Sequence, residues 1–232
     1  MLKTNLGVFI ATIILILFNF LSIYKFGLKY FDETNCIVVF LLFVVFLYNK
    51  CYLNFKLLLA FVLALFANIS LIYYENIVFS FLVNIFKLLF YVVLMWHVIP
   101  LQRNVKITRL DWLSYIFVSF LGFGIIKLLI DSIEQNLEAG LSLLFYIHGL
   151  CLMIVLIIAF RYNSTDFKGA KYFAFLLALF LFSDIFSSFG YYLGYDNLSY
   201  LERFFYTMGL CFTIIYSKKY IAKSVSEKGR VI

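Results

Sequence analysis

Apolar runs long enough to cross a lipid bilayer follow one another along almost the whole chain. A helix needs about 20 apolar residues to span the hydrocarbon core. Eight such runs occur, at about residues 6–24, 36–53, 57–74, 77–99, 112–130, 139–160, 172–193 and 198–216. The sequence therefore predicts an all-α polytopic membrane protein with eight transmembrane helices in a single domain of residues 1–232, including a basic cytoplasmic tail at 217–232.

The amino-acid composition agrees with this class. Hydrophobic residues make up 65% of the chain and charged residues only 13%, whereas about a quarter of the residues of a soluble domain are charged. The chain has too little polar surface to be stable in water. The predicted spans cover most of the chain, so no separate soluble domain fits.

The loops alternate in charge along the chain. One set of loops and ends carries most of the lysines and arginines, among them Lys3, Lys50, Lys56, Arg103, Lys106, Arg109, Arg161, Lys168, Lys171, Lys218, Lys228 and Arg230. The other set carries the acids Asp32, Glu33, Glu75, Asp131, Glu134, Glu138 and Asp196. Because cytoplasmic loops are enriched in Lys and Arg, we expect a cell (inner) membrane protein with both termini in the cytoplasm.

The run at 36–53 is the weakest of the eight, since its apolar stretch ends at Tyr48, directly before Asn49 and Lys50. A seven-span protein without this helix is an alternative. It would divide the basic loops between the two sides of the membrane, so the alternation of charge favours eight spans.

Cofactors and nucleic acid are not expected. Cys36, Cys51, Cys151 and Cys211 form no Cys-x-x-Cys pair, and neither they nor the two histidines have the spacing of metal ligands. The net charge of +7 lies mainly in the loops and the tail, without the basic helix and aromatic platforms of a nucleic-acid interface. Membrane lipids are the partners that the sequence predicts.

Two charged residues lie deep within predicted spans. Asp184 is in the middle of the run at 172–193, and Lys87 is near the middle of the run at 77–99. An ionisable group at that depth normally faces the protein interior and has a partner or a function. In one interpretation the two residues form a structural ion pair, and Asp184 stays ionised. In the other, they face a polar cavity in which Asp184 gives and takes protons.

Further polar residues are expected at a similar depth, on several different spans. They are Asn68, Asn84, His148, Glu202 and Tyr206. Ser187 and Ser188 follow Asp184 at helical spacing and extend one polar face. The alternative for the asparagines is a hydrogen bond between neighbouring helices, for His148 a packed and hydrogen-bonded side chain, and for Glu202 a side chain that snorkels to the headgroups. A lysine Schiff base with an aspartate counter-ion, as in retinal proteins, fits Lys87 and Asp184 but not an eight-span topology.

The two halves of the chain contain a similar segment. Leu63 to Ile69 aligns with Leu179 to Ile185, so that Asn68 falls opposite Asp184, and each segment leads to a Tyr-Tyr pair. Asn68 and Asp184 are 116 residues apart, which is half of the chain. This indicates a possible parallel duplication of a four-helix unit, an arrangement that often places a polar site between the repeats. Chance alignment of two Leu/Phe-rich helices is the alternative.

The polar positions in spans three and seven resemble those of the lysoplasmalogenase family of YhhN-like membrane proteins. Members of that family have a small residue followed by Asp in each of these helices. Ser183-Asp184 matches the second pattern, and Ala67-Asn68 matches the first with an amide in place of the acid. The family's histidine in span four has no counterpart, and Asn84 and Lys87 stand in that region.

The resemblance implies an activity. It is the acid-catalysed hydrolysis of the vinyl-ether bond of a lysoplasmalogen, with Asp184 as the acid and Asn68 orienting water. Because Asn68 cannot accept a proton, His148 or Glu202 would have to supply a second acid or base. Lys87, Asn84, His148, Ser183, Ser187 and Tyr206 are the expected substrate-binding residues. The alternative is a non-catalytic lipid-binding or signalling membrane protein with the same fold, and a transporter ranks third.

Overall fold

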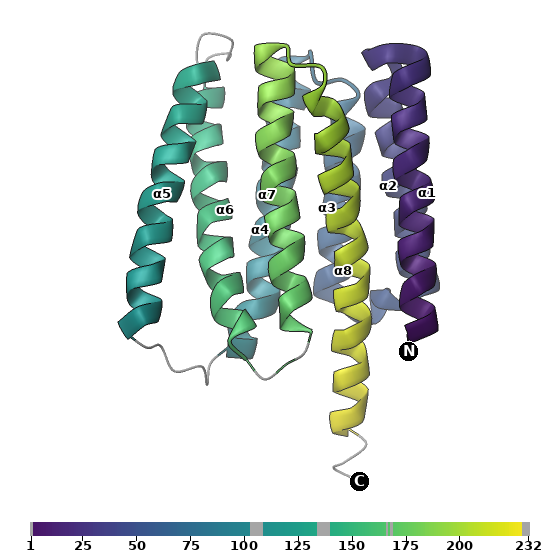
Figure 1. Ribbon diagram of the computed structural model, residues 1–232, viewed down its shortest axis with the longest axis vertical. Helices are drawn as coiled ribbons and strands as arrows, with labels where there is room; N and C mark the ends of the chain where they lie inside the picture. The colour runs from purple at the N-terminus through teal and green to yellow at the C-terminus, as the bar shows by residue number, and fades with distance from the viewer. Residues whose placement is uncertain (1, 103–108, 134–139, 166, 168, 229–232) are drawn as a thin grey trace.

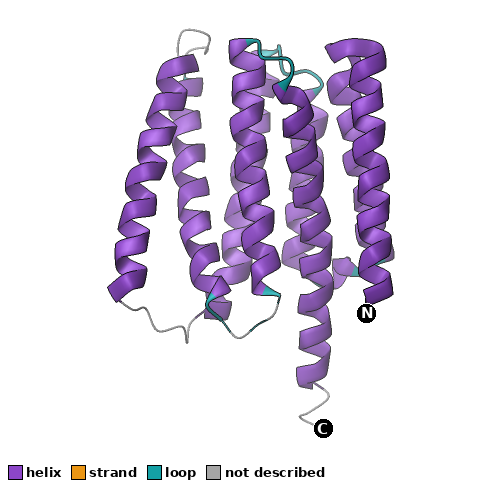
Figure 2. Ribbon diagram, in the orientation of Figure 1, coloured by secondary structure: helices purple, strands orange, loops and turns teal. Residues whose placement is uncertain are grey.

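The protein forms a bundle of long helices. The computed structural model describes residues 2–102, 109–133, 140–165, 167 and 169–228; the structure is 92% helical, and no strand occurs within these residues. The helices are α1 (Leu2–Phe26), α2 (Phe31–Tyr48), α3 (Phe55–Leu71), α4 (Ile77–Val98), α5 (Arg109–Ile133), α6 (Leu141–Asn163), α7 (Ala170–Leu193) and α8 (Leu198–Lys228). Short 3-10 helices occur at Gly27–Tyr30, Cys51–Leu53 and Ile99–Gln102. Figure 2 shows this all-helical architecture.

Six of the described helices are long and apolar enough to cross a membrane. They comprise α1, α2, α4 with its 3-10 extension, α5, α6 and α7. Helix α3 is apolar but has only 17 residues, and α8 is not among the six. Large apolar side chains are exposed on the outer helices, for example Leu21 on α1 and Phe120 on α5 (65% and 78% exposed). Such surfaces are unfavourable in water and favourable against acyl chains, so the structure is that of a membrane protein.

The helix boundaries depart from the apolar runs in two places. Helix α2 begins at Phe31 and ends at Tyr48, rather than covering 36–53. Its first turn includes Asp32 and Glu33, which the hydropathy pattern assigned to a loop. Helix α8 continues without a break beyond residue 216 to Lys228, so most of the predicted tail is helical. Arg103, Lys106, Glu134, Glu138, Lys168 and Arg230 lie outside the described residues.

Local sequence explains several helix ends. The Asn54 side chain accepts a hydrogen bond from the Leu57 backbone N–H at the start of α3, and Asn76 does the same for Val78 at the start of α4. These are N-caps, which satisfy backbone donors that the first helical turn leaves unpaired. Gly194 ends α7 with φ of 70°, a left-handed conformation that glycine adopts without strain.

The helices run approximately side by side, and α1 begins at the same end of the bundle at which α8 ends (Figure 1). The pairs α3–α4 and α7–α8 make the most extensive contacts. A continuous core from α2, α3, α4, α6, α7 and α8 fills the centre, with Phe46, Phe61, Phe173 and Ile214 fully buried. Helix α5 lies at the edge of the bundle; it packs mainly on α6 and less extensively on α7.

The turn between α2 and α3 is anchored to α8. The Cys51 thiol lies 3.8 Å from the Ile214 carbonyl oxygen, and the Ser217 hydroxyl donates to the Cys51 carbonyl (3.5 Å). Burial raises the pKa of the Cys51 thiol to about 11, because the thiolate is poorly solvated there. Cys51 therefore stays protonated and acts as a packing residue.

Candidate functional site

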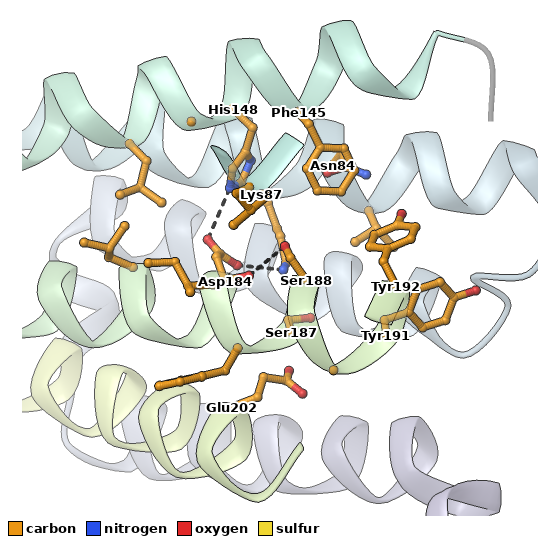
Figure 3. Close-up of a pocket in the computed structure, with 18 of the residues that line it drawn as sticks. Asn84, Lys87, Phe145, His148, Asp184, Ser187, Ser188, Tyr191, Tyr192 and Glu202 are labelled. Carbon is orange, nitrogen blue, oxygen red and sulfur yellow. Dashed lines mark hydrogen bonds and ion pairs between the residues drawn. The ribbon is translucent and has the colours of Figure 1, made fainter. Parts of the chain in front are cut away.

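A cavity of about 960 Å³ lies among the helices of the bundle. Helices α4, α5, α6 and α7 form most of its wall, and α2, α8 and the α3–α4 turn contribute at one end. Figure 3 shows the polar part of this cavity. Its volume is at the upper end of the range for small-molecule sites, about 300–1,000 Å³, so the cavity can hold a molecule the size of a single-chain lipid.

Asp184 is the centre of a hydrogen-bond cluster at the cavity wall. Lys87 Nζ donates to Asp184 Oδ1 at 2.7 Å, and the Tyr91 hydroxyl donates to Oδ2, also at 2.7 Å. His148 Nε2 lies 3.2 Å from the same Oδ2 (Figure 3). Lys87 and Tyr91 are four residues apart on α4, so they share one face of that helix. Helices α4 and α6 thus place a cation and two further polar groups around one carboxylate on α7.

The two sequence-based interpretations of Lys87 and Asp184 both describe part of this site. The ion pair is formed, and it holds the negative charge of Asp184 in place. The pair is not enclosed in a dry core, because both side chains line the cavity and are 24% and 15% exposed. An ion pair at a cavity wall neutralises its own desolvation cost and remains accessible to a ligand.

His148 has one ring nitrogen that no described group satisfies. Its Nε2 faces Asp184, and its Nδ1 is buried without a hydrogen-bond partner among the described residues. His148 also lines the cavity. A buried unpaired polar atom is uncommon in a folded protein and calls for an explanation such as a ligand or water. Nδ1 is therefore a candidate contact for a molecule in the cavity.

A second charged cluster borders the same cavity. Arg203 on α8 is 1% exposed; its Nη2 donates to Asp32 Oδ1 at 3.0 Å, and its Nη1 lies 3.5 Å from Glu202 Oε1. The guanidinium group also lies over the Phe31 ring, 3.5 Å from the ring centre. Asp32 and Glu202 line the cavity. The sequence analysis missed Asp32, because it began the predicted span at residue 36, after the charged residues Asp32 and Glu33.

Three of the predicted site residues do not line the cavity. Asn68 is 5% exposed and belongs to a separate cluster, in which its amide donates to the Tyr206 hydroxyl (2.6 Å) and to the Ala64 carbonyl (2.7 Å). The Asn35 side-chain amide donates to the Asn68 side-chain oxygen Oδ1. The Asn68 amide is thus occupied by protein groups. Tyr206 and Ser183 are not part of the cavity wall either, whereas Asn84 and Ser187 are.

The two Tyr-Tyr pairs of the aligned segments meet at one end of the cavity. The Tyr74 and Tyr192 hydroxyls are 2.6 Å apart, and the Tyr74 ring packs edge-on against Tyr191, with ring centres 4.9 Å apart. Glu33 and Glu75 are exposed beside them. This end of the cavity is therefore aromatic and acidic. The contact between the two Tyr-Tyr pairs was not predicted from the sequence, in which Tyr74 and Tyr192 are 118 residues apart.

No group of three or more His, Cys, Asp or Glu side chains with the geometry of a metal site occurs within the described ranges. Comparison with known proteins gave no match: no protein-family model matches the chain, and neither a curated protein nor a solved structure matches it significantly. The function is therefore inferred from the site itself.

Proposed function

We propose that the protein is a multi-pass protein of the cell (inner) membrane that takes a single-chain lipid into its cavity. One observation carries this proposal: the cavity joins an apolar chamber to a charged centre. The chamber is lined on α5 by Leu121, Ile125 and Leu129 and on α6 by Leu152 and Leu156. An acyl or alkenyl chain fits the first part, and a polar headgroup fits the second.

The proposed topology has eight spans with both termini in the cytoplasm. The alternation of charge between successive loops supports it, and so does the location of the helix ends, since α1 begins where α8 ends (Figure 1). Under this topology α3 crosses the bilayer as a short span, and α8 extends from the membrane into the cytoplasm.

The proposed 4+4 repeat has support from three residue pairs. The offset of 116 residues that relates Asn68 to Asp184 also relates Lys87 to Arg203 and Asp32 to His148. In each half, the cation on the fourth helix contacts an aspartate of the other half: Lys87 contacts Asp184 on α7, and Arg203 contacts Asp32 on α2. The contact pattern is compatible with a duplication, since α3–α4 and α7–α8 are the two most closely packed pairs.

The reaction that we propose is hydrolysis of a vinyl ether in a lysoplasmalogen, as the family resemblance implies. Protonation of the alkenyl chain creates a cation next to the ether oxygen. Because Lys87 and Tyr91 hold Asp184 in place as a carboxylate, its suitable task is to stabilise that cation rather than to donate the proton. His148, through Nδ1, is placed to orient the attacking water.

A non-catalytic lipid-binding protein is the second candidate. The state of Asn68 favours it, because its amide is engaged by Asn35, Tyr206 and Ala64 and does not reach the cavity. In this case the ion pair at the cavity wall serves only to recognise a headgroup.

An assay with three matched lysolipids separates these candidates. The purified protein is offered an alkenyl, an alkyl and an acyl lysolipid with the same headgroup and chain length, and both binding and aldehyde release are measured. Aldehyde from the alkenyl lipid alone, abolished in Asp184→Asn and retained in the exposed control Asp196→Asn, supports hydrolysis. Binding of all three without aldehyde supports the second candidate. Absence of binding contradicts both.

A further inference from the structure

The charges around the cavity do not balance. The carboxyl groups of Asp32, Asp184 and Glu202 line it, together with the cation Lys87. Arg203 does not line the cavity, but it contacts Asp32 and Glu202. Glu33 and Glu75 are exposed at its end and can be hydrated. Within the described part of the chain, two permanent cations therefore serve three partly buried carboxyl groups. Because an unpaired buried charge is costly, one of the three is expected to hold a proton.

The contacts identify which carboxyl group this is. Asp184 faces Lys87, Tyr91 and His148. Asp32 accepts a hydrogen bond from Arg203 at 3.0 Å, and its side chain is 32% exposed. Of the three carboxyl groups, Glu202 has the weakest stabilisation of a negative charge. Its side chain is 9% exposed, and the one described cation within ion-pair distance is Arg203, which it shares with Asp32: Nη1 lies 3.5 Å from Glu202 and makes no hydrogen bond, whereas Nη2 donates to Asp32.

We propose that Glu202 is the protonated group of the cavity and the general acid of the vinyl-ether hydrolysis. This inference rests on the proposed function and adds a residue that the Ser183-Asp184 pattern does not include. Glu202 lies near enough to Lys87 and Asp184 to interact with both electrostatically. Figure 3 shows its side chain between α8 and α7, near Ser187. Two carboxyl groups in contrasting environments are the usual arrangement for an acid and its ionised partner.

The reaction balances with these two groups and one water molecule. The Glu202 proton is transferred to the outer carbon of the C=C bond, whose electron pair forms the new C–H bond. The inner carbon becomes an oxocarbenium ion beside the Asp184 carboxylate. Water adds to that carbon, and its released proton returns to Glu202. The hemiacetal then breaks its C–O bond as its hydroxyl proton moves to the leaving oxygen, giving an aldehyde and an alcohol.

The titration of Glu202 depends on all the charged neighbours that face it. These are Arg203 beside it on α8, Asp32 on α2, Lys87 on α4 and Asp184 on α7. Lys87 and Arg203 favour the charged form of Glu202, and the two aspartates oppose it. Removal of Asp32 as Asp32→Asn should therefore free Arg203 for Glu202 and slow the reaction without removing any group that we place on the substrate.

The experiment compares wild type, Glu202→Gln, Glu202→Asp and the exposed control Asp196→Asn as full-length proteins in detergent. We expect aldehyde release to fall about 100-fold or more in Glu202→Gln, the scale of general acid catalysis, with unchanged binding of the alkyl lysolipid. Glu202→Asp should recover part of the rate. Infrared difference spectra across a pH titration should show a protonated-carboxyl band in wild type and Asp196→Asn that is missing in Glu202→Gln.

Two results would overturn the inference: an aldehyde rate in Glu202→Gln within about threefold of wild type, which is far smaller than a general acid contributes, or a protonated-carboxyl band that persists in this variant. Failure of the proposed function is a separate result, because it shows as wild-type protein that binds the alkenyl lipid and releases no aldehyde. The infrared measurement needs no activity, so it tests the protonation of Glu202 in either case.

Discussion

The two charged clusters beside the cavity use the same chemistry in different surroundings. In each, a cation from one helix pairs with an aspartate from another, Lys87 with Asp184 and Arg203 with Asp32. Arg203 is 1% exposed and covered by the Phe31 ring, whereas Lys87 is 24% exposed at the wall of a large cavity. We call the Arg203 cluster closed because its cation is enclosed, and the Lys87 cluster open because its cation lies at the cavity wall; Asp32 and Glu202 of the closed cluster still line the cavity.

The difference lies in the helices that flank each cluster. Helix α1 packs along α8, which carries Arg203. Helix α5, which would occupy the corresponding position in the proposed 4+4 repeat, packs mainly on α6 and leaves the space that α4 and α7 face. The cavity thus lies where α5 makes few contacts with helices other than α6. The polar residues are similar in both places, and the packing around them decides which of the two cations lines the cavity.

The largest effect on stability is expected from Arg203→Met. This change leaves Asp32 without its enclosed cation, and breaking a buried pair on one side costs about 3–5 kcal/mol. Unfolding by SDS in mixed micelles measures the loss. Arg203→Lys, which keeps the charge, should lose less. Equal stability of Arg203→Met and wild type would show that the closed cluster contributes nothing to the fold.

A smaller loss is expected from Lys87→Met, because the open cluster can be hydrated. We expect a loss of about 1–3 kcal/mol, the cost of an unsatisfied polar group. The double variant Lys87→Met with Asp184→Asn should recover part of it, since neither charge then remains. The same unfolding measurement applies. A loss in Lys87→Met greater than that in Arg203→Met would reverse our assignment of closed and open clusters.

The smallest effect on stability is expected from Gly149→Ala, which tests the contact that holds α5 on α6. A Cβ at Gly149 would lie 2.9 Å from Ile126 Cγ1, so Gly149→Ala should push the two helices apart and cost about 1 kcal/mol. Gly124→Ala on α5 is the matched control, because nothing lies within 4 Å of its Cβ, and it should be neutral or slightly stabilising. If both variants behave alike in thermal unfolding, this close approach does not anchor α5.

The helical architecture could be predicted from hydropathy alone, since each of the eight apolar runs falls on an α-helix. The errors occur where tertiary contacts override the apolar pattern. Asp32 belongs to α2 because Arg203, 171 residues away, is its partner, and a scan of local hydropathy cannot detect such a pairing. Whether each helix crosses the membrane, and whether the halves are a duplication, remain predictions.

The site was predicted in part. Depth in the span indicated that Lys87, His148 and Asp184 belong together, and the structure brings them into contact. Depth gives no information about direction around a helix axis, and so Asn68, which is at a similar depth, was placed in the same site. Its side chain points to Asn35 and Tyr206 instead. The cavity depends on the packing of α5, which no single segment of the sequence encodes.

The account depends on one lipid occupying the cavity, and native mass spectrometry with an uncleavable alkyl lysolipid measures this directly. Ser187 lines the cavity and Ser132 is exposed on α5, so Ser187→Trp should block the site and Ser132→Trp should not. We predict that wild type and Ser132→Trp each retain one lysolipid per chain and that Ser187→Trp binds it at least about tenfold more weakly, a difference of about 1.4 kcal/mol. Equal retention by all three proteins would contradict the account.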